Sequence, residues 1–153
     1  MIVEYHRLHR DVLRPSRANP SDAGLDVYAY LPEEKLVSIM PHHSVIIPTG
    51  LRFGIPHGYM LQVMNRSSVA SKRGLIVGAH VIDSGYDGEV FINLINVGEI
   101  WQTVKHGQKI AQLVMIPVVH FRAFEEICGV LYDEHHPITI SKRGSGALGS
   151  TDE

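Results

Sequence analysis

The chain has 153 residues, of which 44% are hydrophobic and 20% are charged, so it has enough apolar side chains for one packed domain. Its 14 Lys and Arg residues against 16 Asp and Glu residues give a formal net charge of -2. This balance excludes nucleic-acid binding by bulk positive charge, so a polyanionic ligand would have to meet a local cationic cluster. One cysteine, Cys128, allows no intrachain disulfide, no apolar run is long enough to cross a bilayer, and the N-terminal stretch is charged where a signal peptide is apolar. We therefore expect a cytoplasmic protein that binds neither membrane nor nucleic acid.

Most of the chain is predicted to form short strands, because proline and glycine repeatedly interrupt β-branched stretches. In residues 89–96, the alternation places Val90, Ile92 and Leu94 on one face of a strand. Without long helical periodicity, this pattern predicts an all-β sandwich or barrel. The expected strands are residues 2–8, 35–40, 44–47, 51–55, 59–64, 75–77, 89–96, 109–119 and 121–124.

One segment, residues 66–73, is predicted to be a short helix. Ser67 and Ser68 suit its N-cap, and Gly74 is the usual residue at a helix end. Arg66 next to two hydroxyls also suits phosphate oxygens. The segment is therefore either a phosphate-binding site or a capped surface helix with a solvated arginine.

Residues 81–90 are predicted to be a β-hairpin, with Ser-Gly and Asp-Gly as turn residues. Asp83 lies where the first strand enters the turn. Its carboxylate would either bond the local backbone in an Asx-turn or, held on a rigid element, take a proton from water. Tyr86 would pack flat against a sugar or against the sheet.

Gln112 interrupts an otherwise apolar strand, and its amide needs partners because an unsatisfied buried amide costs about 1–3 kcal/mol. Those partners are either backbone groups or a water and a phosphate. The chain has 10 histidines, but adjacent ones such as His42 and His43 point to opposite faces of a strand. We therefore expect no protein-ligated metal, and instead a Mg²⁺ carried by the ligand.

The last residues, 143–153, are rich in glycine and serine and are predicted to form a flexible arm. Arg143, Ser150 and Thr151 could contact phosphates while the arm closes over a site. The alternative is a plain disordered end.

In this order, five stretches of the chain resemble the trimeric dUTP diphosphatase (dUTPase) family. They cover nearly the whole chain and are residues 22–27, 66–68, 78–89, 107–114 and 143–151. The resemblance implies a jelly-roll-like β barrel that forms a homotrimer with active sites at subunit interfaces. Residues 1–142 would form the hydrolase domain, and residues 143–153 would be an arm that closes a neighbouring subunit's site. The implied reaction converts dUTP to dUMP and pyrophosphate, which limits uracil in DNA.

The resemblance also implies roles for individual residues. Asp83 would activate the water that attacks the α-phosphorus, and Arg66 and Ser67 would bind phosphates. Gln112 would help to fix the phosphate and the water, and Tyr86 would pack under the deoxyribose and exclude a ribose 2′-hydroxyl.

The arm would contribute Arg143, Ser150 and Thr151 at the γ-phosphate, with Mg²⁺ bridging the phosphates. Asp26 is expected to be structural at the level of the trimer. Further expected substrate-binding residues lie in the same stretches and are Ser68, His80, Val81, Gly146 and Leu148.

Four positions depart from the pattern of this family. His80 stands where glycine is common, Gly85 replaces a frequent Asp, Leu148 replaces the aromatic residue that stacks on uracil, and Asp152 replaces a glycine. Because base–aromatic stacking is worth about 1–3 kcal/mol, we expect a weaker or differently shaped lid.

Three alternatives follow. The stretch from Ala79 to Gly85 also resembles dCTP deaminase, a sister family, but that reaction needs a glutamate where this chain has Asn93. Hydrolysis of dCTP, alone or beside dUTP, stays open. A non-catalytic module that binds nucleotides and regulates a partner is the third.

Overall fold

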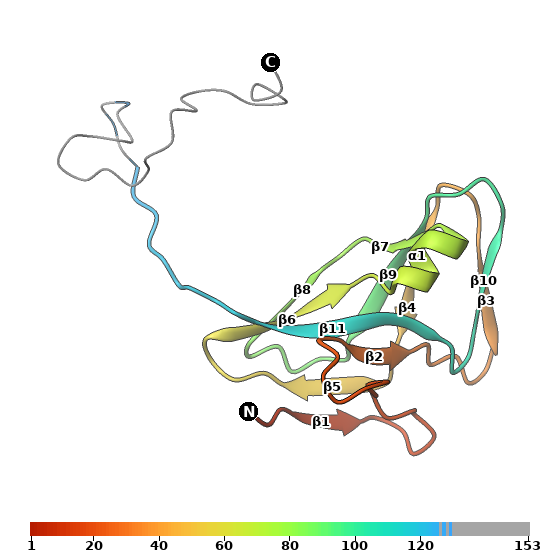
Figure 1. The fold of residues 1–153 in the computed structure, drawn as a ribbon, viewed down its shortest axis with the longest axis horizontal. Helices are drawn as coiled ribbons and strands as arrows, with labels where there is room; N and C mark the ends of the chain where they lie inside the picture. Colours follow the sequence, from red (N-terminus) through yellow and green to blue (C-terminus); the bar gives the residue numbers. More distant parts are fainter. Residues whose placement is uncertain (126, 128, 130–153) are drawn as a thin grey trace. The chain divides into compact units, whose positions relative to one another are not determined.

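The computed structural model describes residues 1–125, 127 and 129, and Figure 1 shows the fold. These residues form short strands and one helix, α1 (Ser67–Arg73). The strands are β1 (Glu4–Arg7), β2 (Leu25–Tyr28), β3 (Leu36–Ile39), β4 (Ser44–Pro48), β5 (Leu51–Gly54), β6 (Tyr59–Met64), β7 (Leu75–Val77), β8 (Val81–Asp83), β9 (Phe91–Asn96), β10 (Gln102–Lys105) and β11 (Lys109–Pro117).

The strands are arranged in four antiparallel sheets. The largest has the strand order β2-β11-β6-β8, the next β4-β9-β7, and the two small ones are β1-β5 and β10-β3. The predicted all-β class with one short helix is therefore confirmed. The hydrogen bonds among the described residues do not join the four sheets into one ring, so the predicted barrel is not closed in this chain.

The core lies between the inward faces of the sheets. In β9 and the residue before it, the predicted alternation is confirmed, because Val90, Ile92 and Leu94 are all buried. Asn96 at the end of the same strand is also buried, and its amide is satisfied by the carbonyls of Ile39 at 3.0 Å and Ile100 at 2.8 Å. Apolar side chains of β2, β6 and β11 fill the opposite side of the core.

Helix α1 follows β6 directly and ends at Gly74, as predicted. Gly74 has a left-handed backbone, with a φ of 60°, and its N–H caps the carbonyl of Ala70. The predicted serine cap is wrong, because Arg66 is the N-cap residue and no side chain caps the helix. Ser67 begins the helix, and its carbonyl accepts a hydrogen bond from the Ser71 hydroxyl at 2.7 Å.

Two further predictions are corrected by the strand pairing. Residues 81–90 do not form a hairpin, because β8 pairs with β6 whereas β9 pairs with β4 and β7. Residues 121–124 do not form a strand, and Phe121 and Phe124 are 84% and 83% exposed. The first strand of that hairpin does exist as β8, with a different partner, whereas β2 and β10 are strands that the sequence did not predict.

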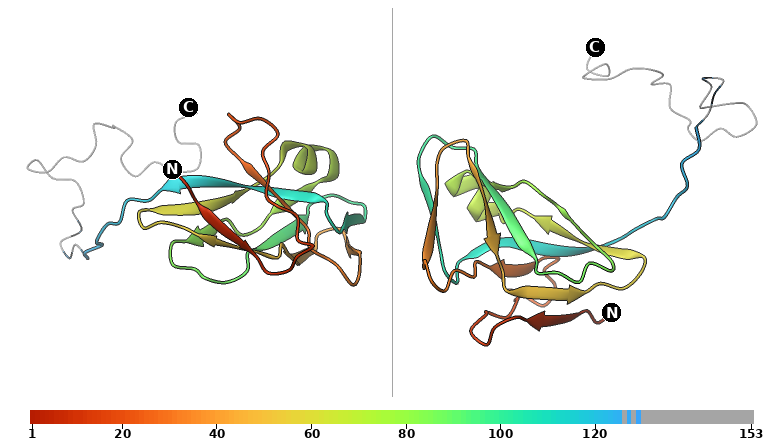
Figure 2. Two further views of the ribbon diagram at one scale, coloured as in Figure 1. Left: turned by 90° about the horizontal axis from the view of Figure 1, so that it is seen from below. Right: turned by 180° about the vertical axis from the view of Figure 1, so that it is seen from behind.

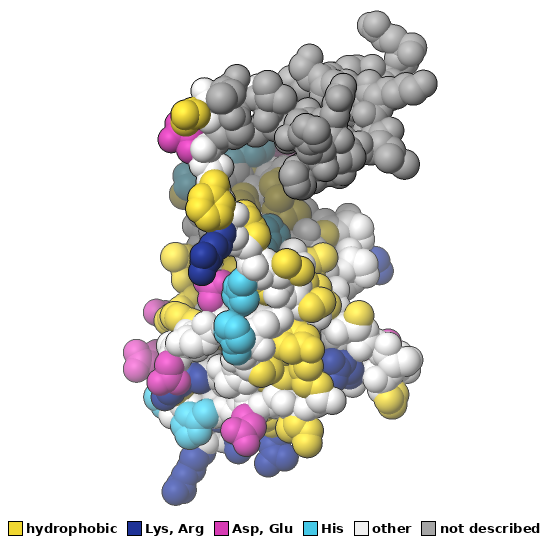
Figure 3. All heavy atoms as spheres, turned by 90° about the vertical axis from the view of Figure 1, so that its left-hand side faces the viewer, with side chains coloured by type: hydrophobic (Ala, Val, Ile, Leu, Met, Phe, Trp, Pro, Cys, Tyr) yellow, Lys and Arg dark blue, Asp and Glu magenta, His cyan; other side chains and the backbone are white. Residues whose placement is uncertain are grey.

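The chain divides into two units, Met1–His120 and Phe121–Glu153, and all the named elements belong to the first. Within it, Figure 2 shows from two further sides that β1 lies along β5. On the face shown in Figure 3, apolar side chains gather right of the centre, two His side chains lie in the middle, and Lys and Arg side chains are scattered, with several at the lower edge. Across the residues that the structure describes, no helix has the length and apolar character needed to cross a membrane.

Candidate active site

The candidate catalytic residues lie along the outer face of the largest sheet, and β6 relates them to one another. Gln112 of β11 is paired with Met64 at one end of β6, and Asp83 of β8 is paired with Met60 at the other end. Residues with inward side chains alternate with them, since Leu61, Val63 and Leu113 are buried. Gln112 and Asp83 therefore share one face of one sheet.

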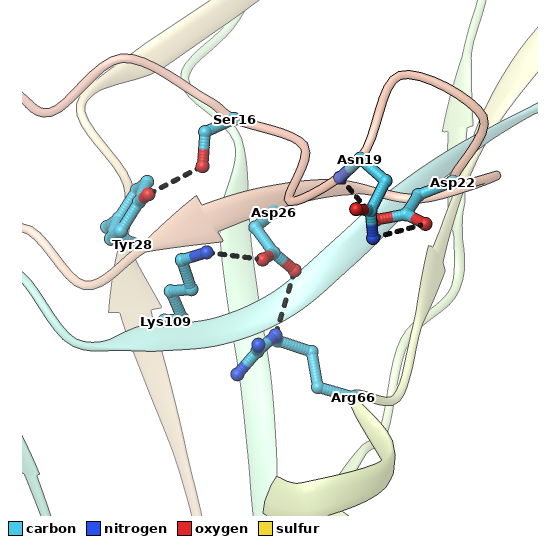
Figure 4. A network of polar contacts seen from close by, with 7 residues as sticks. All are labelled: Ser16, Asn19, Asp22, Asp26, Tyr28, Arg66 and Lys109. Atoms are coloured by element: carbon cyan, nitrogen blue, oxygen red, sulfur yellow. Dashed lines mark hydrogen bonds and ion pairs between the residues drawn. The ribbon is translucent and has the colours of Figure 1, made fainter.

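At the Met64 end of β6, three charged side chains form a compact cluster. The Arg66 Nε donates to Asp26 Oδ1 at 2.8 Å, and the Lys109 Nζ lies 2.8 Å from Asp26 Oδ2. Figure 4 shows Asp26 between the two cations, with the terminal nitrogens of Arg66 on the side away from it. We call Asp26, Arg66, Lys109 and Gln112 the Arg66 corner.

The electrostatics of the Arg66 corner favour an anion. Two cations share one carboxylate, so the three charged groups carry one net positive charge. Only the Nε of Arg66 forms a hydrogen bond to another described residue, which leaves the terminal Nη groups for the two parallel bonds that a phosphate accepts. The hydrogen bond to Asp26 raises the pKa of Lys109, so its ammonium stays charged at neutral pH.

The amide of Gln112 is held beside this cluster. Its Nε2 donates to the Asn65 carbonyl at 2.8 Å, and the Asn65 side chain in turn accepts from the Val77 N–H at 2.7 Å. The Gln112 side chain lies on Gly24, where an added Cβ would stand 1.8 Å from Gln112 Oε1. Of the two alternatives for Gln112, the backbone partner is the one observed, and its carbonyl oxygen keeps acceptor capacity for a ligand.

At the other end of β6, a pocket of about 220 Å³ surrounds Asp83. The Asp83 carboxylate is exposed and forms none of the hydrogen bonds or ion pairs found in the described part of the chain. The Asx-turn alternative is therefore wrong, because the turn is closed by the backbone, with the Tyr86 N–H donating to the Asp83 carbonyl at 3.3 Å. Val81, Tyr86, Glu89 and Phe91 are among the lining residues, and we call this the Asp83 pocket.

The turn that follows Asp83 is fixed by hydrogen bonds to neighbouring segments. The Tyr86 hydroxyl donates to the Glu89 carbonyl at 2.9 Å, and the Glu89 Oε1 accepts from the Gly50 N–H at 2.7 Å. Gly88 lies under the Tyr86 ring, because a Cβ there would stand 2.4 Å from the hydroxyl oxygen. Tyr86 is thus held in one position beside Asp83, with part of its ring exposed.

The Arg66 corner and the Asp83 pocket do not meet within one chain. Their partners on β6, Met64 and Met60, are four residues apart. Along the strand this is a separation of about 13 Å, and the two groups also lie on opposite flanking strands. A water molecule bound to Asp83 is therefore out of hydrogen-bonding reach of Gln112 in the same chain.

Of the remaining predicted residues, some are described by the structure and the others are not. Ser67 and Ser68 are exposed at the start of α1, next to Arg66. His80 is bound to β6, since its Nδ1 donates to the Val63 carbonyl at 2.9 Å, and it is not among the residues that line the Asp83 pocket. The others lie outside the described residues and are Arg143, Gly146, Leu148, Ser150 and Thr151.

Lys109 is the residue of the site that the sequence analysis missed. Strict alternation along β11 would place Lys109 and Gln112 on opposite faces. The pairing with β2 shifts between Lys109 and Ala111, so that Ile110 and Ala111 are both buried and Lys109 turns to the face of Asp26. Two consecutive apolar residues at 110 and 111 are the only sequence signal for this bulge.

An unpaired carboxylate in a pocket and a fixed arginine with free donors define a candidate hydrolase of phosphate esters or anhydrides on an all-β scaffold. The sequence pattern of the dUTPase family matches residues 11–151. The chain therefore belongs to the dUTPase family.

Two curated relatives support this membership. The deoxyuridine 5′-triphosphate nucleotidohydrolase of Gloeobacter violaceus is 37% identical over 151 residues, which are 97% of this chain and 95% of the relative. The enzyme of the same name from Chlamydia trachomatis is 38% identical over 141 residues, which cover 91% of this chain and 90% of the relative.

Solved structures show the same fold. A complex of a mutant dUTPase of Staphylococcus bacteriophage 80alpha with dUpNHpp has a TM-score of 0.81 and 25% identity, and the match covers 98% of both chains. A dUTPase from phage phi11 of S. aureus, described with a structural Mg(II) ion, has a TM-score of 0.74 and 24% identity over 83% of this chain and 97% of that one.

Proposed function

We propose that this protein hydrolyses dUTP to dUMP and pyrophosphate in the cytoplasm and so limits uracil in DNA. Membership of the dUTPase family supports the reaction. One observation supports the assignment of the reaction to particular residues. The carboxylate of Asp83 is free and lies beside Tyr86 in a pocket of about 220 Å³. No other carboxylate of the site is free, because Asp26 is shared by two cations and Glu89 accepts from Gly50.

In the proposed reaction, Asp83 takes a proton from a water molecule while the water oxygen attacks the α-phosphorus. The bond between the α-phosphorus and the oxygen that bridges to the β-phosphate breaks, and pyrophosphate leaves with the electron pair of that bond. Arg66 binds the phosphate oxygens through its free Nη groups, and Lys109 adds positive charge behind it. Gln112 and the exposed hydroxyls of Ser67 and Ser68 complete this proposed phosphate site.

The ring of Tyr86 is proposed to pack under the deoxyribose. Its hydroxyl is engaged with the Glu89 carbonyl, and the ring cannot retreat because Gly88 lies against it. A ribose 2′-hydroxyl would have to enter this occupied space. We therefore propose that the pocket discriminates against UTP, while Val81 and the neighbouring backbone contact the base.

We propose that the complete site forms between subunits of a homotrimer. The Arg66 corner and the Asp83 pocket are about 13 Å apart along β6 in one chain, so one catalytic site needs both parts from different copies. On the outer face of the sheet between them, the apolar side chains of Met64 and Val81 are exposed beside Gln62. Such a face suits a subunit interface, in which the jelly-roll-like barrel would be one protomer.

The arm of residues 143–153 and a Mg²⁺ ion belong to the same proposal. The arm would close a neighbouring subunit's site with Arg143, Ser150 and Thr151 at the γ-phosphate and with Gly146 and Leu148 near the base. Among the described residues, no three His, Cys, Asp or Glu side chains lie together as a metal site. We propose that Mg²⁺ enters on the triphosphate, where such an ion would neutralise phosphate charge.

A panel of nucleotides tests the reaction. The protein is incubated with dUTP, dCTP, UTP and the other deoxynucleoside triphosphates with Mg²⁺, and the products are identified. We expect monophosphate and pyrophosphate from dUTP, a much slower reaction with UTP, and loss of turnover in EDTA. Deaminated triphosphate from dCTP would contradict the proposal, and it is not expected because Asn93 has no acid–base function in the position that the deaminase requires.

A mixing experiment tests the shared site. Asp83→Asn is expected to lower kcat at least about 100-fold with substrate binding retained, because it removes the base. Arg66→Gln is expected to be similarly inactive. When the two variants are co-expressed and assemble at random, about one quarter of the sites in a trimer combine an intact Asp83 with an intact Arg66 from the next subunit. Activity that stays at the level of the single variants would refute a site shared between subunits.

A further inference from the structure

The N-terminal segment concentrates positive charge, and it reaches the Arg66 corner only at Ser16, which pairs with Asp26. Four of the nine arginines of the chain lie within residues 7–17, whereas the chain as a whole has a net charge of -2. Between residues 5 and 14 the only acidic residue is Asp11. The segment is therefore a local cluster of positive charge. In a chain without surplus positive charge, a polyanionic ligand requires such a cluster.

These residues form a concave surface of about 500 Å³, which we call the basic bowl. It is lined by Arg7, Arg10, Arg14, His6, His9 and Tyr5, among others, and no acidic residue lines it. None of the three arginines takes part in an ion pair with another described residue. The basic bowl shares no lining residue with the Asp83 pocket.

The loop that forms the bowl is held in shape from within. The Nη1 of Arg7 donates to the carbonyls of Arg10 at 3.0 Å and Val12 at 3.1 Å. Val12 is buried against Gly50, whose φ of 68° and close approach to Val12 leave no room for a Cβ. The Leu8 N–H also donates to the Gly50 carbonyl at 2.9 Å. The loop is thus ordered before any ligand binds, which lowers the entropy cost of binding.

The carboxylates on neighbouring elements are engaged with other groups. Asp11 accepts from the Tyr30 hydroxyl at 3.0 Å, Glu89 accepts from the Gly50 N–H, and Asp87 pairs with Arg52. The three guanidinium groups that face the concavity form no ion pair with a described carboxylate, so they repel one another, and a multivalent anion would reduce this repulsion. Guanidinium donors bind phosphate oxygens in pairs, which selects phosphates over a single point charge.

We propose that the basic bowl is a second anion site, separate from the hydrolytic site, that binds an oligophosphate group. The ligand is either an inorganic oligophosphate or the phosphate chain of a nucleotide, since both present the same oxygens. Arg10 and Arg14 bind the phosphates from the exposed side, and Arg7 holds the loop. The proposal does not depend on the hydrolytic function.

Calorimetry with sodium tripolyphosphate tests this site in the full-length protein, without divalent metal and with the substrate site saturated by dUpNHpp. We expect one tripolyphosphate per chain in addition to the analogue, with affinity that falls as salt rises. The variant R10Q/R14Q is expected to bind at least about tenfold more weakly, because it removes two charge-assisted contacts. The same titration with a nucleoside triphosphate distinguishes the two ligands. If the nucleotide binds more tightly than tripolyphosphate and the difference depends on Tyr5, the ligand is a nucleotide. If both bind equally, the site recognises the phosphate chain alone.

The matched control is K72Q/K105Q, which changes the net charge equally at two exposed lysines outside the bowl. It is expected to retain tripolyphosphate binding, and thermal unfolding checks that both variants are folded. Absence of a second binding event, or equal weakening in both variants, would overturn the proposal. Binding of single-stranded DNA without binding of tripolyphosphate would overturn it as well, in favour of a nucleic-acid surface.

Discussion

Asp26→Asn is the substitution that tests most directly how the candidate site is held together. The amide keeps the shape of the side chain and removes its charge, so Arg66 and Lys109 lose the carboxylate that lies 2.8 Å from each of them. Exposed ion pairs are worth about 0–1 kcal/mol, whereas removal of one partner from a buried pair costs about 3–5 kcal/mol. The Asp26 side chain is 13% exposed and those of its partners 26% and 32%, which places the cost between these limits, at about 2–3 kcal/mol.

Thermal and urea unfolding at fixed protein concentration measure this cost. A loss of about 2–3 kcal/mol lowers the Tm by about 4–12 °C for a domain of this size. Asp22→Asn is the matched control, because Asp22 lies in the same stretch but its carboxylate accepts hydrogen bonds only from Asn19. We expect the control to lose less than about 1 kcal/mol. If Asp26→Asn is as stable as the parent, the ion-pair cluster does not stabilise the fold, and our account of Arg66 positioning is refuted.

Two further predictions concern the same corner. Gly24→Ala is expected to displace Gln112, because the new Cβ would stand 1.8 Å from the Oε1 of Gln112 and 2.9 Å from the Cβ of Gln112. Steady-state kinetics should then show a lower kcat while the protein stays folded. An unchanged kcat would contradict a role for Gln112. Alkaline pH is expected to destabilise the protein. The hydrogen bond to Asp26 raises the pKa of Lys109, and burial together with Asp11 raises the pKa of Tyr30. Both groups hold their protons longer in the folded state, so stability is full below about pH 10 and falls as the pH rises through the folded pKa values, which urea titrations between pH 8 and 11 would measure. In Asp26→Asn the part that comes from Lys109 should disappear.

Strands with one buried face were predictable from the sequence, and the reason is physical. In β6 and β9 a slip by one residue would expose every apolar side chain of the inner face, so the alternation fixes which side chains point outward. The helix end was also predictable, because Gly74 adopts the left-handed conformation that glycine tolerates best.

The pairing of residues 81–90 was not predictable from local signals. Ser-Gly and Asp-Gly are good hairpin turns, and Gly85 does have a φ of 87°. However, β8 has only three residues, and its hydrogen bonds go to β6, which precedes it by a helix and another strand. The observed pairing with β6 buries Ile82 in the core, which a local turn signal does not encode.

Residues 121–124 show the opposite failure. Phe121 and Phe124 give the segment the composition of a strand, but a strand needs a partner with free backbone groups. Within the described chain the segment has no such partner, and both side chains are exposed. The composition of a segment shows that its side chains favour a packed position in a sheet. Whether a neighbouring strand offers that position depends on the rest of the chain.

The division of the site into two parts also follows from charge. A triphosphate brings about four negative charges, and Asp83 adds another beside the water that it is proposed to deprotonate, so cations have to face the substrate from the opposite side. If Arg66 lay beside Asp83 in one chain, the two would form an ion pair, and the base and the phosphate ligand would both be lost. β6 prevents this by separating them, while Asp26 provides Arg66 with a counter-ion that is nearly buried and out of the reaction. A site assembled from two copies can therefore keep a free carboxylate and a free guanidinium until the substrate lies between them, which is why we expect the mixed trimers of Asp83→Asn and Arg66→Gln to regain activity that neither variant has alone.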